Sequence, residues 1–298
     1  MKNSLALSFL SAATVLLSYP VLQAEAASSN KQSFEQWCLQ KDSLSPETQK
    51  TVDVLLEEAD TQDCKLANSR LNSLTELYLY FVQISDVKPL SALTNLTKLG
   101  LSGNQISDVK PLANLTNLTV LVLRHNQIHD ITPLSSLTNL TELYLSSNQI
   151  HDITPLSRLI SMTHLTLDEN PISNIKPLES LTNLIKLELG YNHLINDVKP
   201  LASLTNLTEL YLDGNQISNI KPLAGLTKLE YLHLFGNHII DVKPLSSLNN
   251  LRVLFLSGNQ ISDIKPLASL TKLEYLMLDR NPITEKVCPI KPASVCGF

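Results

Sequence analysis

The chain has 298 residues and a formal net charge of −5, with 43% hydrophobic and 17% charged residues. The charges are spread along the chain without a basic stripe, which argues against nucleic acid or an anionic membrane surface as a partner. Two domains would be expected from the length alone, but an internal repeat changes this expectation, because the length of a repeat array depends on the number of units.

The first 26 residues have the organisation of a cleavable secretory signal peptide. Lys2 is followed by a short apolar run, and Ala24-Glu25-Ala26 has the A-x-A form of a cleavage site. The uninterrupted apolar stretch is shorter than the ~20 residues that span a bilayer, which disfavours the alternative of a retained membrane anchor. We therefore expect cleavage after Ala26, no stable membrane insertion and a secreted protein, either extracellular or periplasmic.

Residues 27–70 are expected to form an N-terminal cap that contains a helix. The segment Ser45-Pro46-Glu47 offers an N-cap residue, a proline suited to the first helical position and an acid in the first turn. Apolar residues follow at positions that lie on one helical face. The sequence therefore predicts a helix from about Pro46 to Ala59 that covers the first unit of the repeat.

A 22-residue unit is repeated ten times over residues 71–284. The fourth unit, LTNLTELYLSSNQIHDITPLSR, is typical, and only the sixth is longer, with one extra residue within Asn192–Asp197. A fixed period of this length indicates stacked structural units and not separate globular domains. The units open at Leu71, Leu93, Leu115, Leu137, Leu159, Leu181, Leu204, Leu226, Leu248 and Leu270.

Each unit contains three kinds of recurring residue. Leucines such as Leu143 and Leu145 alternate with other residues and should point inward from an extended segment. Proline recurs in D-V-K-P-L or D-I-T-P-L, which suits a 3-10 turn whose free N–H groups the preceding acid can bond. Asparagine recurs where a buried amide can bond the turning backbone of adjacent units. These asparagines are Asn104, Asn126, Asn148, Asn170, Asn192, Asn215, Asn237, Asn259 and Asn281.

The repeat L-x-x-L-x-L-x-x-N-x-I is the signature of a leucine-rich repeat solenoid. We predict an α/β fold of this type. A curved parallel sheet should form the concave side, and short 3-10 or turn segments should form the convex side. The leucines of one unit are buried only by its neighbours, so the stability of the array depends on contacts between units.

The four cysteines lie outside the repeats, at Cys38, Cys64, Cys288 and Cys296. They allow three pairings. The ends of ten stacked units are roughly 45 Å apart at strand spacing, whereas bonded cysteines need Cα atoms within about 7 Å. We therefore predict the disulfides Cys38–Cys64 and Cys288–Cys296, the second within a C-terminal cap over residues 285–298. Redox or zinc chemistry is disfavoured because neither C-x-x-C nor C-x-x-H spacing occurs.

The residues that flank the inward leucines should face the concave side. Aromatic side chains are concentrated there in the last four units, and aromatics on rigid strands make good interface anchors because they lose little rotamer entropy. The alternative is that they only cover the sheet and raise strand propensity. The predicted partner-binding residues are Tyr211, Tyr231, His233, Phe235, Phe255, Tyr275 and Met277.

Three further clusters are interpreted without a functional role. Tyr78, Tyr80 and Phe81 of the first unit are expected to pack under the N-terminal cap. His129 and His151 should lie side by side, but they lack a third converging ligand and are interpreted as polar surface, not as a metal site. A mixed charged patch of the middle units is interpreted as a solvated face; it comprises Glu142, His164, Asp168, Glu169, Lys186 and Glu188.

The run LTNLTELYLSSNQIHDITPLS closely resembles the repeat of bacterial internalins and of the phosphatase-regulator class of leucine-rich repeats. The resemblance covers about Leu71 to Thr284. Similarity to internalins implies a concave face that binds host or other cell-surface proteins, although the immunoglobulin-like module and wall-anchoring tail of many internalins do not follow here. Similarity to phosphatase regulators implies a cytosolic partner, which the signal sequence contradicts. The cysteine-bounded flanks look like those of small secreted bacterial repeat proteins.

These observations predict a secreted, non-catalytic protein that binds a protein or glycan partner through its concave face. The alternative is a periplasmic or extracellular regulator or inhibitor of an enzyme that uses the same face. An enzyme is disfavoured because no acid, base and nucleophile stand out from the repeat pattern. No metal, cofactor or nucleic acid is expected.

Overall fold

The computed structural model describes residues 32–298, which form one unit from Gln32 to Phe298. The expected signal peptide over residues 1–26 lies outside the described residues. Within residues 32–298, no helix combines the length and the apolar character needed to cross a bilayer.

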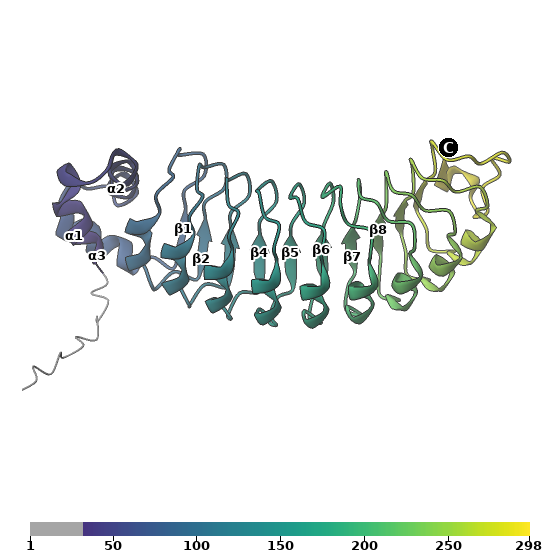
Figure 1. The fold of residues 1–298 in the computed structure, drawn as a ribbon, viewed down its shortest axis with the longest axis horizontal. Coiled ribbons are helices and arrows are strands. Elements are labelled where there is room, and N and C mark those ends of the chain that lie inside the picture. The colour runs from purple at the N-terminus through teal and green to yellow at the C-terminus, as the bar shows by residue number, and fades with distance from the viewer. Residues whose placement is uncertain (1–31) are drawn as a thin grey trace, which may run out of the picture. The chain divides into compact units, whose positions relative to one another are not determined.

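One parallel sheet of eleven strands runs through the described residues, and each strand pairs with the strand of the next unit (Figure 1). The register is constant, so that Leu99 pairs with Leu121 and Leu121 with Leu143. Equivalent residues of successive units therefore stand side by side on the concave side, as the sequence predicted. The strands are β1 (Glu76–Tyr78), β2 (Lys98–Gly100), β3 (Val120–Val122), β4 (Glu142–Tyr144), β5 (His164–Thr166), β6 (Lys186–Glu188), β7 (Glu209–Tyr211), β8 (Tyr231–His233), β9 (Val253–Phe255), β10 (Tyr275–Met277) and β11 (Cys296–Gly297).

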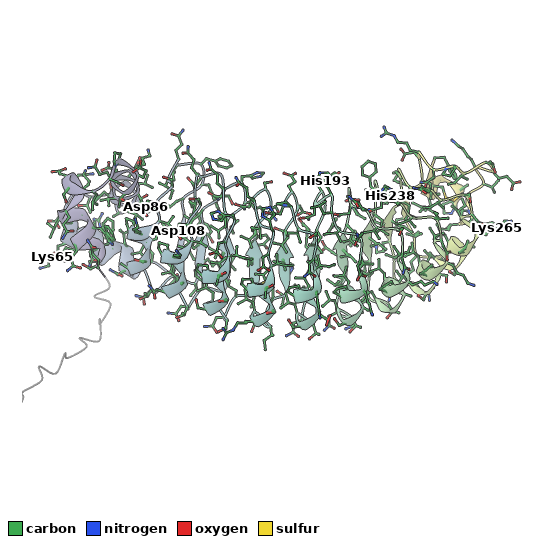
Figure 2. The ribbon with its side chains drawn as sticks, in the orientation of Figure 1. Lys65, Asp86, Asp108, His193, His238 and Lys265 are labelled. Carbon is green, nitrogen blue, oxygen red and sulfur yellow. A yellow bond between two sulfur atoms is a disulfide. The ribbon has the colours of Figure 1, made fainter. Side chains whose placement is uncertain are left out.

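Short 3-10 helices on the convex side return the chain from one strand to the next, and each has its proline at the second position. Asp86 and Asp108, labelled in Figure 2, each accept a hydrogen bond from the backbone N–H two residues further on, at 3.0 and 2.9 Å. This confirms the capping role expected for the acid that precedes the proline. The 3-10 helices are η2 (Lys88–Ala92), η3 (Lys110–Asn114), η4 (Thr132–Ser136), η5 (Thr154–Arg158), η6 (Lys176–Ser180), η7 (Lys199–Ser203), η8 (Lys221–Gly225), η9 (Lys243–Ser247) and η10 (Lys265–Ser269).

The interior consists of leucine and isoleucine columns crossed by the asparagine ladder. Leu143, Leu145 and Ile150 are completely buried. Asn148 donates from Nδ2 to Leu123 O at 3.0 Å and to Leu145 O at 2.9 Å, and its Oδ1 accepts from Ile128 N at 3.0 Å. One amide thus satisfies backbone groups of its own unit and of the unit before it, which confirms the structural role predicted for the ladder.

The N-terminal cap contains three helices: α1 (Phe34–Leu39), α2 (Pro46–Glu58) and α3 (Cys64–Ser73), with a short 3-10 helix η1 (Lys41–Ser43). The predicted helix is confirmed as α2 to within one residue at its C-terminal end. Its N-cap is Ser45, whose hydroxyl accepts a hydrogen bond from a backbone N–H of the first turn. Helices α1 and α3 were not predicted.

Hydrogen bonds attach this cap to the first unit, and a disulfide joins two of its helices. Thr48 Oγ1 donates to Asp86 Oδ2 at 2.5 Å, and Thr51 Oγ1 donates to Asp86 O at 2.6 Å. The predicted disulfide Cys38–Cys64 joins α1 to α3, with Cα atoms 5.5 Å apart. Helix α2 is therefore docked on the turn that follows β1.

The C-terminal cap closes the other end of the sheet. The predicted disulfide Cys288–Cys296 is present, and its Cys296 is the first residue of β11, which pairs with β10 in parallel. A short 3-10 helix, η11 (Ala293–Val295), leads into this strand. The sequence did not predict β11, which covers the edge that β10 would otherwise expose to another chain.

Candidate concave-face binding site

The strand face consists of the outward residues of the strands, and its composition changes along the sheet. Because the strands are in register, each outward position forms a column that crosses the units. The column of Tyr211 continues with His233, Phe255 and Met277. A second column contains Tyr231, Val253 and Tyr275. Six of the seven residues predicted to bind a partner thus lie in two adjacent columns of four neighbouring strands, and only Phe235 lies beside them.

Three of these rings form a continuous aromatic stack. The ring centroids of Tyr211 and His233 are 4.6 Å apart in an edge-on arrangement, and those of His233 and Phe255 are 4.2 Å apart and stacked. All three side chains are partly buried by one another and partly exposed on the strand face. Such contacts hold the rings in one orientation before any partner arrives.

The other predicted residues surround this stack with different degrees of exposure. Tyr231 and Phe235 are partly buried, whereas Tyr275 is 56% exposed and Met277 is also exposed. Phe235 lies in the column after the strand, where its N–H donates to Asp213 Oδ1 at 2.8 Å. The stack therefore has an exposed apolar extension toward β10.

Charged groups border the stack on the β6 side. Lys186 Nζ lies 2.9 Å from Glu188 Oε1 and 3.1 Å from Glu209 Oε2, and it stands 5.1 Å above the centroid of the Tyr211 ring. Tyr211 OH donates to Glu209 Oε2 at 3.0 Å. Burial, together with this hydrogen bond, raises the pKa of Tyr211 to about 12. The tyrosine is therefore a neutral, fixed hydrogen-bond donor at the edge of the site.

Asp168 corrects the interpretation of the charged patch as a solvated face. Its Oδ1 accepts from Gly190 N at 2.8 Å, and its Oδ2 accepts from Ser146 Oγ at 3.1 Å. Burial, followed by the charge of Glu188, raises the pKa of Asp168 to about 7. Sequence reasoning missed this site because the carboxylate bonds to groups of both adjacent units, and no single unit shows these contacts.

The aromatic cluster of the first unit also differs from the expectation. Tyr78, Tyr80 and Phe81 are not buried under the cap: these residues are 45, 42 and 73% exposed. The rings of Tyr80 and Phe81 occupy the space that a β-carbon would need at Gly100 and Gly103 of the second unit. They lie across the next unit because its glycines leave room there.

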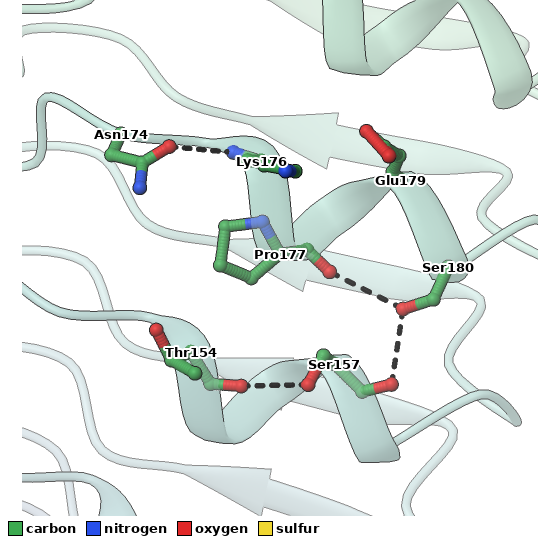
Figure 3. A pocket seen from close by; sticks show the side chains of 7 residues that line it. All are labelled: Thr154, Ser157, Asn174, Lys176, Pro177, Glu179 and Ser180. Carbon is green, nitrogen blue, oxygen red and sulfur yellow. Dashed lines mark hydrogen bonds between the residues drawn. The ribbon is translucent and has the colours of Figure 1, made fainter.

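The convex side and the pair His129 and His151 have fewer features of a binding site than the strand face. A hollow of about 510 Å³ lies between η5 and η6. There Ser180 Oγ donates to Ser157 O at 3.0 Å, a hydrogen bond that joins the two helices (Figure 3). His129 and His151 are exposed. Within residues 32–298, no group of three His, Cys, Asp or Glu side chains is arranged to hold a metal ion.

Comparison with known proteins agrees with this architecture. The sequence pattern of the family described as "Leucine Rich repeats (2 copies)" matches residues 72–114, 116–158, 205–248 and 249–291. The chain belongs to the leucine-rich repeat family. The unmatched stretch between these segments contains the unit with the extra residue. A comparison with curated proteins gave no match.

Solved structures similar to this leucine-rich repeat protein include internalins. Internalin C2 of Listeria monocytogenes is 32% identical with a TM-score of 0.61, and the match covers 77% of this chain and 92% of that one. The functional domain of InlJ from the same organism, which includes a cysteine ladder, is 27% identical with a TM-score of 0.69, covering 85% and 53%. A plant peptide hormone receptor, RGFR1 in complex with RGF2, is 25% identical with a TM-score of 0.62, covering 70% and 36%.

These findings make the chain internalin-like in fold and repeat type. Leucine-rich repeat proteins in general mediate protein–protein interactions, and they are typically non-catalytic modules.

Proposed function

We propose that this leucine-rich repeat protein is secreted, has no catalytic activity of its own and binds a protein partner through the strand face of β7–β10. The observation that carries the proposal is the continuous stack of Tyr211, His233 and Phe255, which is pre-arranged on rigid strands and partly open to solvent. Rigid aromatic side chains are favoured as anchors in protein interfaces because little conformational entropy is lost on binding.

The surroundings of the stack support a protein partner. Apolar area continues from the stack to Tyr275 and Met277, while Lys186, Glu209 and Asp213 provide a charged border. An apolar centre with a polar rim is the usual composition of a protein interface.

Secretion is supported by the cysteines. All four are in disulfides, one in each cap. Disulfides persist mainly in oxidising compartments, and the A-x-A segment at Ala24-Glu25-Ala26 suits export to such a compartment.

The proposal is tested by capture of the partner with an engineered strand face. The purified protein is immobilised, exposed to the extracellular and surface fractions of the native cells, and the bound proteins are identified by mass spectrometry. Replacing Tyr231, Phe235 and Phe255 together by serine should weaken capture about 100-fold or more, because each aromatic anchor contributes on the order of 2 kcal/mol. Unchanged capture contradicts the assignment of this surface.

A matched control replaces residues in the same two outward columns of the sheet, on a strand that is distant from the aromatic stack. Val120 and Val122 are the outward residues of β3, partly exposed like the aromatic residues of β8 and β9. Replacing both by serine should leave capture unchanged. If this control loses the partner as well, the loss does not depend on the aromatic residues.

A further inference from the structure

A second aromatic feature lies at the other end of the sheet, in a hollow between the N-terminal cap and the first unit. We name it the cap hollow. Helix α2 contributes Val54, Glu57 and Glu58 to one wall, and β1 with the residues after it contributes Tyr78 and Tyr80 to the other. Its volume is about 410 Å³. This is within the range of roughly 300–1,000 Å³ that is usual for small-ligand sites.

The aromatic wall is well suited to a positive charge. The ring centroids of Tyr78 and Tyr80 are 5.7 Å apart and the rings are tilted by 36°, so they form two adjoining panels. Tyr78 OH donates to Glu76 Oε2 at 2.9 Å, which increases the electron density of that ring. Both side chains remain more than a third exposed, so that their faces are accessible. Aromatic faces of this kind attract ammonium and guanidinium groups.

The opposite wall of the hollow is acidic, and it lies at the C-terminal end of α2, where a helix favours nearby cations. Glu57 and Glu58 are exposed in the last turn of α2, and this turn has no basic residue. The C-terminus of a helix carries partial negative charge, so acids there raise the local negative potential instead of compensating it.

The nearby cations are engaged elsewhere. Arg70 Nη1 donates to Ala59 O at 2.7 Å and to Asp60 O at 2.9 Å, and Lys98 Nζ lies 2.8 Å from Glu76 Oε1. Among the described residues, neither Glu57 nor Glu58 takes part in an ion pair. The acidic wall therefore has charge available for a ligand.

We propose that the cap hollow binds an organic cation, an ammonium or guanidinium group carried on apolar carbon, between Tyr78 and Tyr80 on one side and Glu57 and Glu58 on the other. The positive charge lies against the ring faces and within reach of the carboxylates, and its carbon atoms contact Val54 and Val82 at the apolar part of the hollow. Such a cation has two possible sources: a Lys or Arg side chain of a partner protein, or a free quaternary amine.

The test is a titration followed by ¹⁵N–¹H correlation spectra of the labelled protein. The probes are tetramethylammonium and N-acetyl-lysine methylamide, and tert-butanol serves as an uncharged probe of similar shape, at constant ionic strength. Both cations should produce saturable shifts of the amides around Glu57, Glu58 and Tyr78–Val82, with an affinity about tenfold or more above that of tert-butanol. Tighter binding of the lysine derivative assigns the site to a partner side chain, and tighter binding of tetramethylammonium assigns it to a free amine.

Variants separate the site from general surface effects. Replacing Glu57 and Glu58 together by glutamine should weaken cation binding about tenfold without altering the packing of α2, because both side chains are exposed. Tyr80→Leu should also weaken it, whereas Tyr80→Phe keeps the ring and should retain it. Phe81→Leu and Glu179→Gln change an exposed aromatic and an exposed acid outside the hollow, and they should have no effect.

The proposal is overturned if the cations produce no saturable shifts, or if tert-butanol produces the same shifts with equal affinity. Retention of full cation affinity in the variant Glu57→Gln/Glu58→Gln also overturns it. The test of the cap hollow does not depend on the function proposed for the strand face of β7–β10, because the hollow lies at the other end of the sheet.

Discussion

At the scale of residues, the ladder asparagines are equivalent in sequence but not in their bonding. Asn148 has partners for both its amide nitrogen and its oxygen. Asn215 donates from Nδ2 to Leu189 O at 2.9 Å and to Leu212 O at 3.1 Å, but its buried Oδ1 has no partner among the described residues. The other ladder oxygens accept from the N–H of the isoleucine twenty residues earlier. For Asn215 this residue is Ile195, which directly follows the extra residue of the preceding unit.

This difference predicts unequal costs of substitution. Asn148→Ala should lower the free energy of unfolding by about 3 kcal/mol, because it leaves buried backbone groups without partners. Asn215→Ala should cost about 1 kcal/mol less, since no donor depends on its oxygen. Denaturant unfolding of the two variants measures the difference, and equal costs contradict the role assigned to the Asn148 oxygen.

Asp168 gives a prediction about pH. Burial and the charge of Glu188 raise its pKa in the folded protein from 3.8 to about 7, so the folded state binds the proton more tightly than the unfolded state. The free energy of unfolding should therefore fall as the pH rises from about 4 to about 7. Asp168→Asn should remove this slope. Its stability relative to the wild type should therefore rise by about 4 kcal/mol between pH 4 and pH 8.

Urea unfolding across this pH range provides the measurement for Asp168. Glu169→Gln is the control, because Glu169 is an exposed acid next in the chain. Parallel pH profiles for wild type and Asp168→Asn are incompatible with a buried, proton-binding Asp168.

At the scale of elements, the caps differ from the repeats in how far the sequence predicts them. Helix α2 has its start marked by Ser45 and Pro46, and it was predicted. Helix α1 is only six residues long, and α3 runs into the first repeat as far as Ser73, so the repeat pattern hides its end. Strand β11 has two residues and forms because β10 offers an unpaired edge, which is information that no local pattern carries.

The disulfide of the N-terminal cap predicts a localised loss of stability. Replacing Cys38 and Cys64 by alanine opens a loop with a sequence separation of 26, which should lower the stability of the cap by about 3 kcal/mol. Each unit contacts only its neighbours, so hydrogen exchange should accelerate in α1–α3 and β1 but not in β7–β10. A uniform increase along the whole array contradicts this nearest-neighbour account.

At the scale of the whole molecule, the repeat is sufficient to predict the parallel sheet, its register and its two faces. It is sufficient because every unit imposes the same inward leucines, such as Leu143, and the same bonding asparagine, such as Asn148. The same reasoning placed Tyr211, His233 and Phe255 in one column, although the closeness of their stacking depends on side-chain packing. It could not place Tyr80, whose ring occupies the space left by Gly100 of the following unit. It also could not place Asp168, whose carboxylate bonds to groups of both adjacent units.

The central claim is that the strand face of β7–β10 recognises a partner. The most direct measurement is the hydrogen-exchange footprint of the captured partner on this chain, with side-chain protection measured in parallel by carboxyl and tyrosine labelling. We predict slower exchange in the segments around β7–β10 and protection of Tyr231 and Tyr275 from labelling. Protection confined to the 3-10 helices η5–η10 on the convex side, with Tyr231 and Tyr275 labelled as in the free protein, contradicts the claim.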